Sequence, residues 1–288
     1  MSYPCRIDLH MHTTVSDGTD TPNEIITHVR EAGIELFSVT DHDALKGCAI
    51  IRSLLKKDDP AFIAGVEFSC KDERGRYHIL GYGYDANAPS INDIVATGHG
   101  FRMSKLMKRL AFLKSEFGFD FTDDDVASLH SLDNPGKPHV ANLMVKYGYA
   151  STKEEAIEKY INKFHSKNEY VRPEDAISAI IRAGGIPVLA HPSYGRGDEL
   201  IVGDDMDDRI KRLIGFGLKG VEAFYSGFSL KLQNEILAFA ERYGLFVTAG
   251  SDYHGKNKLV RLGDTNLTDA SAYPNGLCEF VDAVLSGT

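Results

Sequence analysis

The sequence lacks two features, each of which would have pointed to a class of protein. Positive charge is not in excess, since 32 Lys and Arg residues face 41 Asp and Glu residues and leave a formal net charge of −9. A general binder of nucleic acid or of membrane surfaces carries a basic face. No apolar run reaches the length of a membrane span. We therefore expect neither a membrane partner nor long nucleic acid.

Cysteine is scarce, and its spacing indicates no shared site. Cys5, Cys48, Cys70 and Cys278 form no C-x-x-C pair, so we expect free thiols in a reducing compartment. Residues 1–20 lack the apolar stretch of a signal peptide. There are also no low-complexity tracts and no repeats of fixed period. The simplest prediction is a cytoplasmic protein.

Strands and helices alternate in the first part of the chain. The 288 residues are 43% hydrophobic and 25% charged, which is ordinary for a globular protein with room for an α/β barrel. We predict strands at 7–12, 36–40 and 62–66, with helices between them, and a further strand at 77–82. Thr21-Pro22-Asn23-Glu24 has the signature of a helix start. This βαβ pattern predicts a parallel sheet with function at the carboxyl ends of its strands.

The pattern changes after about residue 88. Residues 91–170 read as helices, at 91–117, 123–130, 139–147 and 153–164, and the α/β alternation returns from residue 173. Further strands are predicted at 186–190, 220–225 and 245–249. We therefore expect a barrel formed by residues 1–90 and 171–288, with residues 91–170 as a helical insertion over the active-site face, where such insertions commonly shape a substrate pocket.

Histidines and carboxylates gather at the predicted strand ends. His10 and His12 lie two residues apart on a strand and so share a face. Six of the eleven histidines lie at or just after predicted strand ends. A random scatter of structural histidines would not place so many there. Imidazole and carboxylate ligands without thiolate suit Mn, Zn or Fe, and the number of ligands implies two or three ions. The nine candidate metal ligands are His10, His12, Asp17, His42, Glu67, His78, His191, Asp252 and His254.

The segments that carry these residues are DLHMHTTVSDGT, SVTDHDALKG, GVEFS, AHP and GSDYHG. They resemble the four motifs of the polymerase and histidinol phosphatase (PHP) family, over residues 5–83 and 172–265. The resemblance implies a distorted (β/α)7 barrel with a trinuclear metal centre, manganese being the first choice and zinc or iron the alternatives. It also implies three ligand groups: His10, His12, Glu67 and Asp252; Glu67, His78 and His191; and Asp17, His42 and His254.

The chain is most similar to the nucleotide and sugar phosphoesterase branch of the family, which carries a helical insertion. It departs from that branch at Lys137, where the branch usually has arginine, and at 160–163, which lack the expected glycines. We expect Lys137 and Arg196 to grip phosphate. Tyr225 is either an aromatic that stacks on a base or sugar or a rim residue that packs on the insertion. Three further cations are weaker candidates for gripping phosphate: Arg102, Lys105 and Arg172. His139 and Asp252 are candidates for the acid that protonates the leaving group.

Three divalent ions with three carboxylates leave the site positive, which favours an anionic substrate. We expect a metal-bound hydroxide to attack phosphorus in line, in a small phosphorylated metabolite such as a nucleotide or ribose phosphate. A cyclic phosphodiester, followed by its monoester, is a further candidate substrate. The alternatives are a histidinol-phosphate phosphatase, a 5′–3′ exonuclease on short oligonucleotides, and a PHP domain without catalysis.

Overall fold

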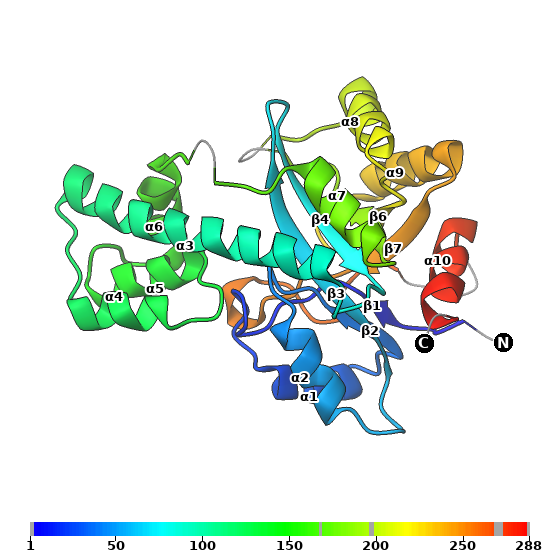
Figure 1. Ribbon diagram of the computed structural model, residues 1–288, viewed down its shortest axis with the longest axis horizontal. Coiled ribbons are helices and arrows are strands. Elements are labelled where there is room, and N and C mark those ends of the chain that lie inside the picture. Colours follow the sequence, from blue (N-terminus) through cyan, green and yellow to red (C-terminus); the bar gives the residue numbers. More distant parts are fainter. Residues whose placement is uncertain (1–2, 167–168, 196–198, 268–272, 287–288) are drawn as a thin grey trace.

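Seven strands form one sheet that curls into a nearly closed barrel. The computed structural model describes residues 3–166, 169–195, 199–267 and 273–286. The strands follow the order of the sequence around the sheet (Figure 1). They are β1 (Ile7–Asp8), β2 (Leu36–Val39), β3 (Ala61–Lys71), β4 (Arg76–Tyr82), β5 (Ile186–Leu189), β6 (Gly220–Tyr225) and β7 (Phe246–Gly250).

The first and last strands meet beyond their regular ladders. The amide of Leu9 donates to the carbonyl of Ala249 over 2.9 Å, and the amide of Asp252 donates to the carbonyl of His10 over 2.8 Å. The amide of His12 continues the pairing with the carbonyl of Tyr253 at 2.8 Å. These bonds confirm the predicted barrel, and they bring the first and last motifs of the sequence side by side.

One strand runs against the others. β4 is antiparallel to both β3 and β5, whereas the remaining neighbours are parallel. The turn at 72–75 is too short for the crossover that a parallel pair needs. β3 also continues to Lys71, so Glu67 lies inside a strand rather than at its end, as does His78 on β4. The expectation that the strands are all parallel and that Glu67 ends its strand was therefore wrong.

In the part of the chain that the structure describes, six α-helices contribute side chains to the barrel core along most of their length. α1 begins with the predicted capping box, in which Thr21 and Glu24 exchange hydrogen bonds with each other's amides. No helix in the described ranges is long and apolar enough to cross a membrane. The six are α1 (Pro22–Glu31), α2 (Lys46–Leu54), α7 (Pro173–Arg182), α8 (Gly203–Gly215), α9 (Leu230–Tyr243) and α10 (Asn275–Leu285).

A short 3-10 helix, η2 (Gly255–Asn257), follows β7. A second group of helices extends to one side of the barrel (Figure 1). They are α3 (Pro89–Phe117), α4 (Asp123–His130), α5 (Lys137–Lys146), α6 (Lys153–Lys159) and the short 3-10 helix η1 (Ile161–Lys163). These helices share a second apolar core that includes Leu106, Leu113, Val140 and Ile161, all buried. α3 reaches both cores, because Ile91 near its start is buried in the barrel core.

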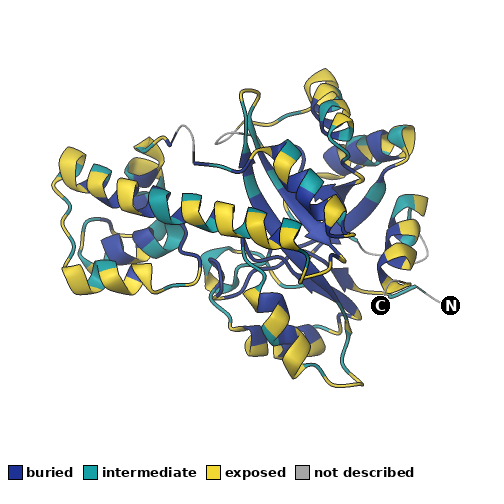
Figure 2. Cartoon of the chain, viewed as in Figure 1, coloured by how far each residue is buried: buried dark blue, intermediate teal, exposed yellow. Residues whose placement is uncertain are grey.

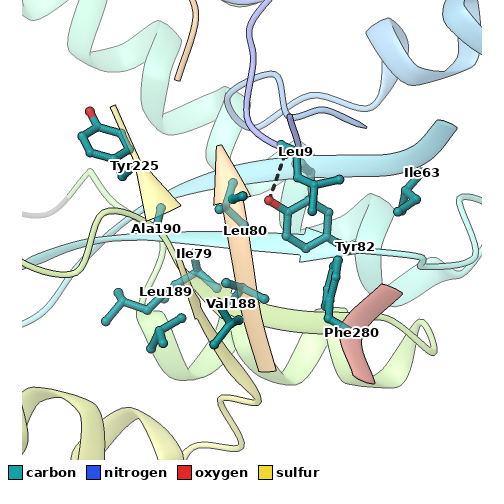
Figure 3. Close-up of a cluster of buried hydrophobic side chains, with 14 of the residues drawn as sticks. Leu9, Ile63, Ile79, Leu80, Tyr82, Val188, Leu189, Ala190, Tyr225 and Phe280 are labelled. Atoms are coloured by element: carbon teal, nitrogen blue, oxygen red, sulfur yellow. Dashed lines mark hydrogen bonds between the residues drawn. The ribbon is translucent and has the colours of Figure 1, made fainter. Parts of the chain in front are cut away.

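Burial follows the sheet and one stripe of each helix (Figure 2). On α3, Gly98 sits so close to the barrel that a Cβ there would lie 2.7 Å from a carboxylate oxygen of Asp43. In the barrel core, Tyr82 packs against Phe280 with ring centroids 5.3 Å apart and donates its hydroxyl to the carbonyl of Leu9 at 2.9 Å (Figure 3). The polar tip of Tyr82 thus fixes the backbone just before His10.

Candidate metal centre

Glu67 is the centre of the site, because its two oxygens face five histidines. Oε2 lies 3.2 Å from His10 Nε2, 3.1 Å from His12 Nε2 and 3.2 Å from His42 Nδ1. Oε1 lies 2.7 Å from His78 Nδ1 and 3.3 Å from His191 Nε2. Side chains from just beyond the ends of β1, β2 and β5 and from the interior of β4 therefore converge on one buried carboxylate.

Two further carboxylates flank this group. Asp252 Oδ1 lies 3.5 Å from Nε2 of both His10 and His12, and 3.3 Å from His254 Nδ1. Asp17 Oδ1 lies 3.3 Å from His254 Nε2 and 3.9 Å from His42 Nε2. With the five histidines around Glu67, these contacts bring all nine sequence-predicted ligands into one constellation.

The donor atoms of the constellation fit divalent ions. Several of its buried nitrogen and oxygen atoms have no hydrogen-bond partner among the described residues. Leaving such atoms unsatisfied is costly unless another group, such as a metal ion, binds them. Three sets of residues offer donor atoms within 4.8 Å of one another: His12, Asp17, His42 and His254; His10, His12 and Glu67; and His42, Glu67 and His78. The buried donors without a partner are His10 Nε2, His12 Nε2, Asp17 Oδ1, His42 Nδ1, Glu67 Oε2 and His191 Nδ1.

The charges inside the constellation are strongly coupled. Burial alone would raise the pKa of Glu67, but the nearby His78, His42 and His10 hold it well below its ordinary value. Burial alone would lower the pKa of His12, but its contacts with Asp252 and Glu67 raise it to about 9. The carboxylates are therefore ionised and ready to bind cations.

Buried carboxylates behind the constellation hold its histidines in place. Glu222, fully buried on β6, faces His10 Nδ1 at 2.9 Å and accepts from the amide of His191 at 2.8 Å. Asp8 accepts from the amide and hydroxyl of Ser251, the residue before Asp252. Such outer partners fix the ring orientation of metal-binding histidines. Neither Glu222 nor Asp8 was among the predicted site residues, and the signal in the sequence was a carboxylate within an apolar strand.

The backbone is unusual at two of the candidate ligands. His191 and Asp252 have positive φ angles of 27° and 57°, a region that is uncommon for residues other than glycine. Strained backbone of this kind gathers at functional sites, because surrounding contacts must hold it in place. Here the bond from His191 to Glu222 and the barrel-closing bond from Asp252 to His10 do so.

Tyr225 lies beside Asp252 with its ring buried, only 4% exposed. Its hydroxyl donates to Asp252 Oδ2 at 2.9 Å and accepts from Lys258 Nζ at 2.8 Å. Its ring packs against those of His191 and Phe228. The ring is thus enclosed rather than offered for stacking on a base or sugar, and Tyr225 acts on the site through its hydroxyl.

The other predicted site residues lie in different surroundings, and only some of them are near the constellation. His139 caps the start of α5, where its Nδ1 accepts from the amide of Gly136 at 3.0 Å. Lys137 lines the cavity beside the constellation. Arg172 has an exposed side chain that pairs with Glu174. Arg196 lies outside the described residues.

The cavity has a volume of about 410 Å³ and reaches from the constellation to the helices at the side of the barrel. Asp17, His42, His78 and His191 line one part of it. Its other part is rich in cationic side chains. Of these, the sequence predicted Arg102, Lys105 and Lys137 as phosphate-binding candidates but not the others. The set is Arg76, Arg102, Lys105, Arg109 and Lys137.

Comparison with known proteins agrees with this site. The model of the PHP domain matches residues 8–172. The chain is 30% identical to a phosphoribosyl 1,2-cyclic phosphate 1,2-diphosphodiesterase of Eggerthella lenta, over 86% of this chain and 94% of that protein. It is 29% identical to a 3′,5′-nucleoside bisphosphate phosphatase of Chromobacterium violaceum, over 86% and 87% of the two chains.

A solved structure extends the similarity to the whole fold. A candidate metal-dependent phosphoesterase from Bifidobacterium adolescentis superposes with a TM-score of 0.80 at 27% identity, over 96% of each chain. The chain therefore belongs to the PHP family, and it is a metal-dependent phosphoesterase of that type. Its buried His, Asp and Glu clusters could hold the metal.

Proposed function

We propose that this chain hydrolyses small phosphate esters, namely nucleotide or ribose phosphates. A cyclic phosphodiester is a second candidate, which the same site would open before removing the remaining phosphate. The observation that carries the proposal is that a single cavity is lined both by the candidate metal ligands and by basic side chains. An ester could then present its phosphoryl group to the constellation while the cations attract its negative charge. The activities named for the Eggerthella and Chromobacterium relatives support this range of substrates.

We further propose three divalent ions, with manganese first and zinc or iron as alternatives. The unsatisfied donors and the three overlapping sets of ligands support more than one ion. When bound, the ions would supply an activated water and positive charge at the phosphoryl oxygens. Glu67 suits a shared ligand, because its two oxygens face different histidines. The nine ligands proposed are those predicted from the sequence.

The protein's own side chains divide the remaining work. Burial alone would raise the pKa of Asp252, but Lys258 and His10 hold it well below its ordinary value. Asp252 therefore accepts hydrogen bonds and holds cations, and is a poor acid for the leaving group. Lys258 carries donor hydrogens on Nζ at the same edge of the site, and we assign it to hydrogen bonding with an ester oxygen. His139, bonded to Gly136 at the start of α5, positions that helix.

The surroundings support a small substrate. We propose that residues 91–170 act as an insertion that encloses it, since α3 and α5 supply cations to the cavity. The net charge of −9 does not favour long nucleic acid. All four cysteines are free, which supports a reducing compartment such as the cytoplasm.

A phosphate-release screen with Mn²⁺ tests the proposal. The substrates are nucleotides, cyclic nucleotides, ribose phosphates, histidinol phosphate and short oligonucleotides. We expect release from nucleotide or ribose phosphates, and incorporation of one labelled oxygen into phosphate when the reaction runs in labelled water. Release of phosphate from histidinol phosphate alone, or of mononucleotides from oligonucleotides alone as measured by chromatography, would favour the corresponding alternative. No release from any substrate, with bound metal verified by elemental analysis, would overturn the proposal.

A further inference from the structure

One set of candidate metal ligands lies against the side helices, which are α3 to α6 with η1. The set consists of Asp17, His42 and His254, whose donor atoms, together with one of His12, lie within 4.8 Å of one another. We call it the helix-side set. Each of the three ligands lies in a different loop, after β1, β2 and β7 respectively. The geometry of the set therefore depends on what holds these loops in place.

Two residues of the side helices hold the segment that carries His42. Asn134, in the turn between α4 and α5, is only 1% exposed and donates from Nδ2 to the carbonyl of His42. Arg102 on α3 donates from Nε and Nη2 to one carboxylate oxygen of Asp43, at 3.2 and 2.8 Å. Both members of this ion pair are buried. Because Asp43 has a φ angle of 48°, the pair also stabilises an uncommon backbone conformation beside His42.

The loops of Asp17 and His254 are joined to each other and to α6. Asn257 donates from Nδ2 to the carbonyl of Asp17 at 2.8 Å, and the amide of Thr19 donates to the carbonyl of His254 at 3.2 Å. Lys153, the first residue of α6, donates from Nζ to Oδ1 of the same Asn257 at 2.8 Å. Through this one amide side chain, α6 contacts both ligand loops.

The other candidate ligands are held by residues of the barrel itself. Glu222 on β6 faces His10 Nδ1 and accepts from the amide of His191. Asp8 on β1 accepts hydrogen bonds from the residue before Asp252. Outer partners of this kind set the orientation of metal ligands. The two groups of ligands thus depend on different parts of the molecule.

We propose that Arg102, Asn134 and Lys153 are positioning residues for one metal ion, the ion bound by the helix-side set, so that the barrel and the side helices build this ion site jointly. Charged lysine and arginine side chains only donate hydrogen bonds, so Arg102 and Lys153 act through their neighbours and not on the ion. A ligand whose supporting bond is lost is no longer held in the geometry that the ion needs. This inference rests on the proposed binding of more than one ion.

The test titrates Mn²⁺ into chelator-treated full-length protein by calorimetry and counts bound manganese by elemental analysis. Lys153→Met is the first variant, because this side chain is only partly buried and the fold depends on it less than on Arg102. We expect it to weaken one bound ion by about tenfold or more and to leave the others unchanged, as is usual when an outer partner is lost. Arg102→Gln and Asn134→Ala, on other elements, should weaken the same ion.

Lys159→Met is the matched control, because Lys159 lies on the same helix as Lys153, is exposed and pairs with Glu155. It should bind manganese like the wild type. A merely structural role of Lys153 would give a different pattern, in which a lower Tm accompanies an equal weakening of all ions. That pattern, or unchanged binding in all three variants, would overturn the proposal.

A double variant identifies the ion that is affected. His42→Ala removes a ligand of the helix-side set, so adding Lys153→Met to it should cost nothing further in manganese binding. Weakening of another ion in that background would assign Lys153 to a different site and contradict the proposal.

Metal binding also separates this inference from the proposed function. If no substrate is hydrolysed but Lys153→Met weakens one bound ion selectively, the positioning role stands and the proposed function falls. If phosphate is released and the three variants bind manganese like the wild type, the positioning role falls alone.

Discussion

The constellation around Glu67 and a basic chamber beside it lie in one cavity, but they deal with buried charge in opposite ways. The basic chamber has a volume of about 280 Å³ and is named after the four cations that line it: Arg76, Lys105, Arg109 and Lys137. In the constellation, negative and potentially positive groups alternate, and each carboxylate faces at least two histidines. In the chamber, cations face one another and two aromatic rings, Tyr170 and Phe164. Opposite charges thus offset one another inside the constellation, whose unsatisfied ligand atoms remain for metal ions, whereas the side chains of the other region bring positive charge without carboxylates among its described lining residues.

The largest expected effect is at the centre of the constellation. Glu67→Gln should lower the phosphate-release rate by on the order of 10³-fold, because a neutral amide cannot hold cations beside five imidazoles. Bound metal, measured by elemental analysis, should fall as well. The control is Glu241→Gln, at an exposed position on α9. Full metal content and activity in the Glu67 variant would show that the constellation is not the metal centre.

A smaller effect on metal binding is expected for Glu222, which contacts a candidate ligand but is not one itself. Glu222→Gln keeps the shape of the side chain but weakens its hold on His10 Nδ1. Metal affinity should fall by about 10- to 100-fold, as is usual when an outer partner of a ligand is lost. Titration of Mn²⁺ into the metal-free protein measures this directly, with Glu241→Gln again as the control. An unchanged affinity would mean that Glu222 only fills space in β6.

The smallest effect is a gain in stability at the basic chamber. Lys105→Met removes a buried cation that faces Arg102 and Arg109 on α3, Arg76 on β4, and Asp43 and Tyr170. Without added phosphate at pH 7, we expect the variant to be more stable by about 1 kcal/mol, seen as a Tm higher by roughly 2–4 °C.

The pH dependence of this difference follows from the lowered pKa. With a pKa of about 7 in the folded protein against 10.5 ordinarily, Lys105 binds fewer protons folded than unfolded between these values. Wild-type stability should therefore rise with pH across this window, and the advantage of Lys105→Met should shrink towards pH 9.5. Thermal melts at pH 7 and 9.5 measure both. If Lys105→Met were less stable than the wild type at pH 7, the packing of the Lys105 side chain would outweigh the cost of burying its charge.

The two regions also differ in how far the sequence could predict them. His10 and His12, or Asp252 and His254, lie two residues apart, so the period of a strand was enough to put each pair on one face. The carboxyl ends of the strands of a barrel lie at one edge, so the other predicted ligands at strand ends could be assigned to the same site. Glu67 and His78 were placed at the site although the antiparallel β4 was not foreseen, because a hairpin returns the chain to the same region.

The chamber has no such local signal. Arg76 on β4, Arg109 on α3 and Tyr170 in the segment before α7 are far apart in the sequence, and the packing of the side helices against the barrel brings them together. Read singly, each resembles a surface cation or aromatic. Glu222 was not predicted for a related reason. A single carboxylate in an apolar strand can be recognised as functional only when its contact with His10 is known. Long-range packing decided these positions, and a single sequence does not display it.

The length of α3 has a consequence for how specificity can vary. At 1.5 Å per residue, its 29 residues span about 43 Å, and Gly98 seats it against Asp43, next to His42. A methyl group at Gly98 would meet Asp43, so we expect Gly98→Ala to push this part of α3 away from the barrel. The same helix carries Arg102, Lys105 and Arg109, which line the cavity. The position of these cations relative to the candidate metal ligands therefore depends on a glycine.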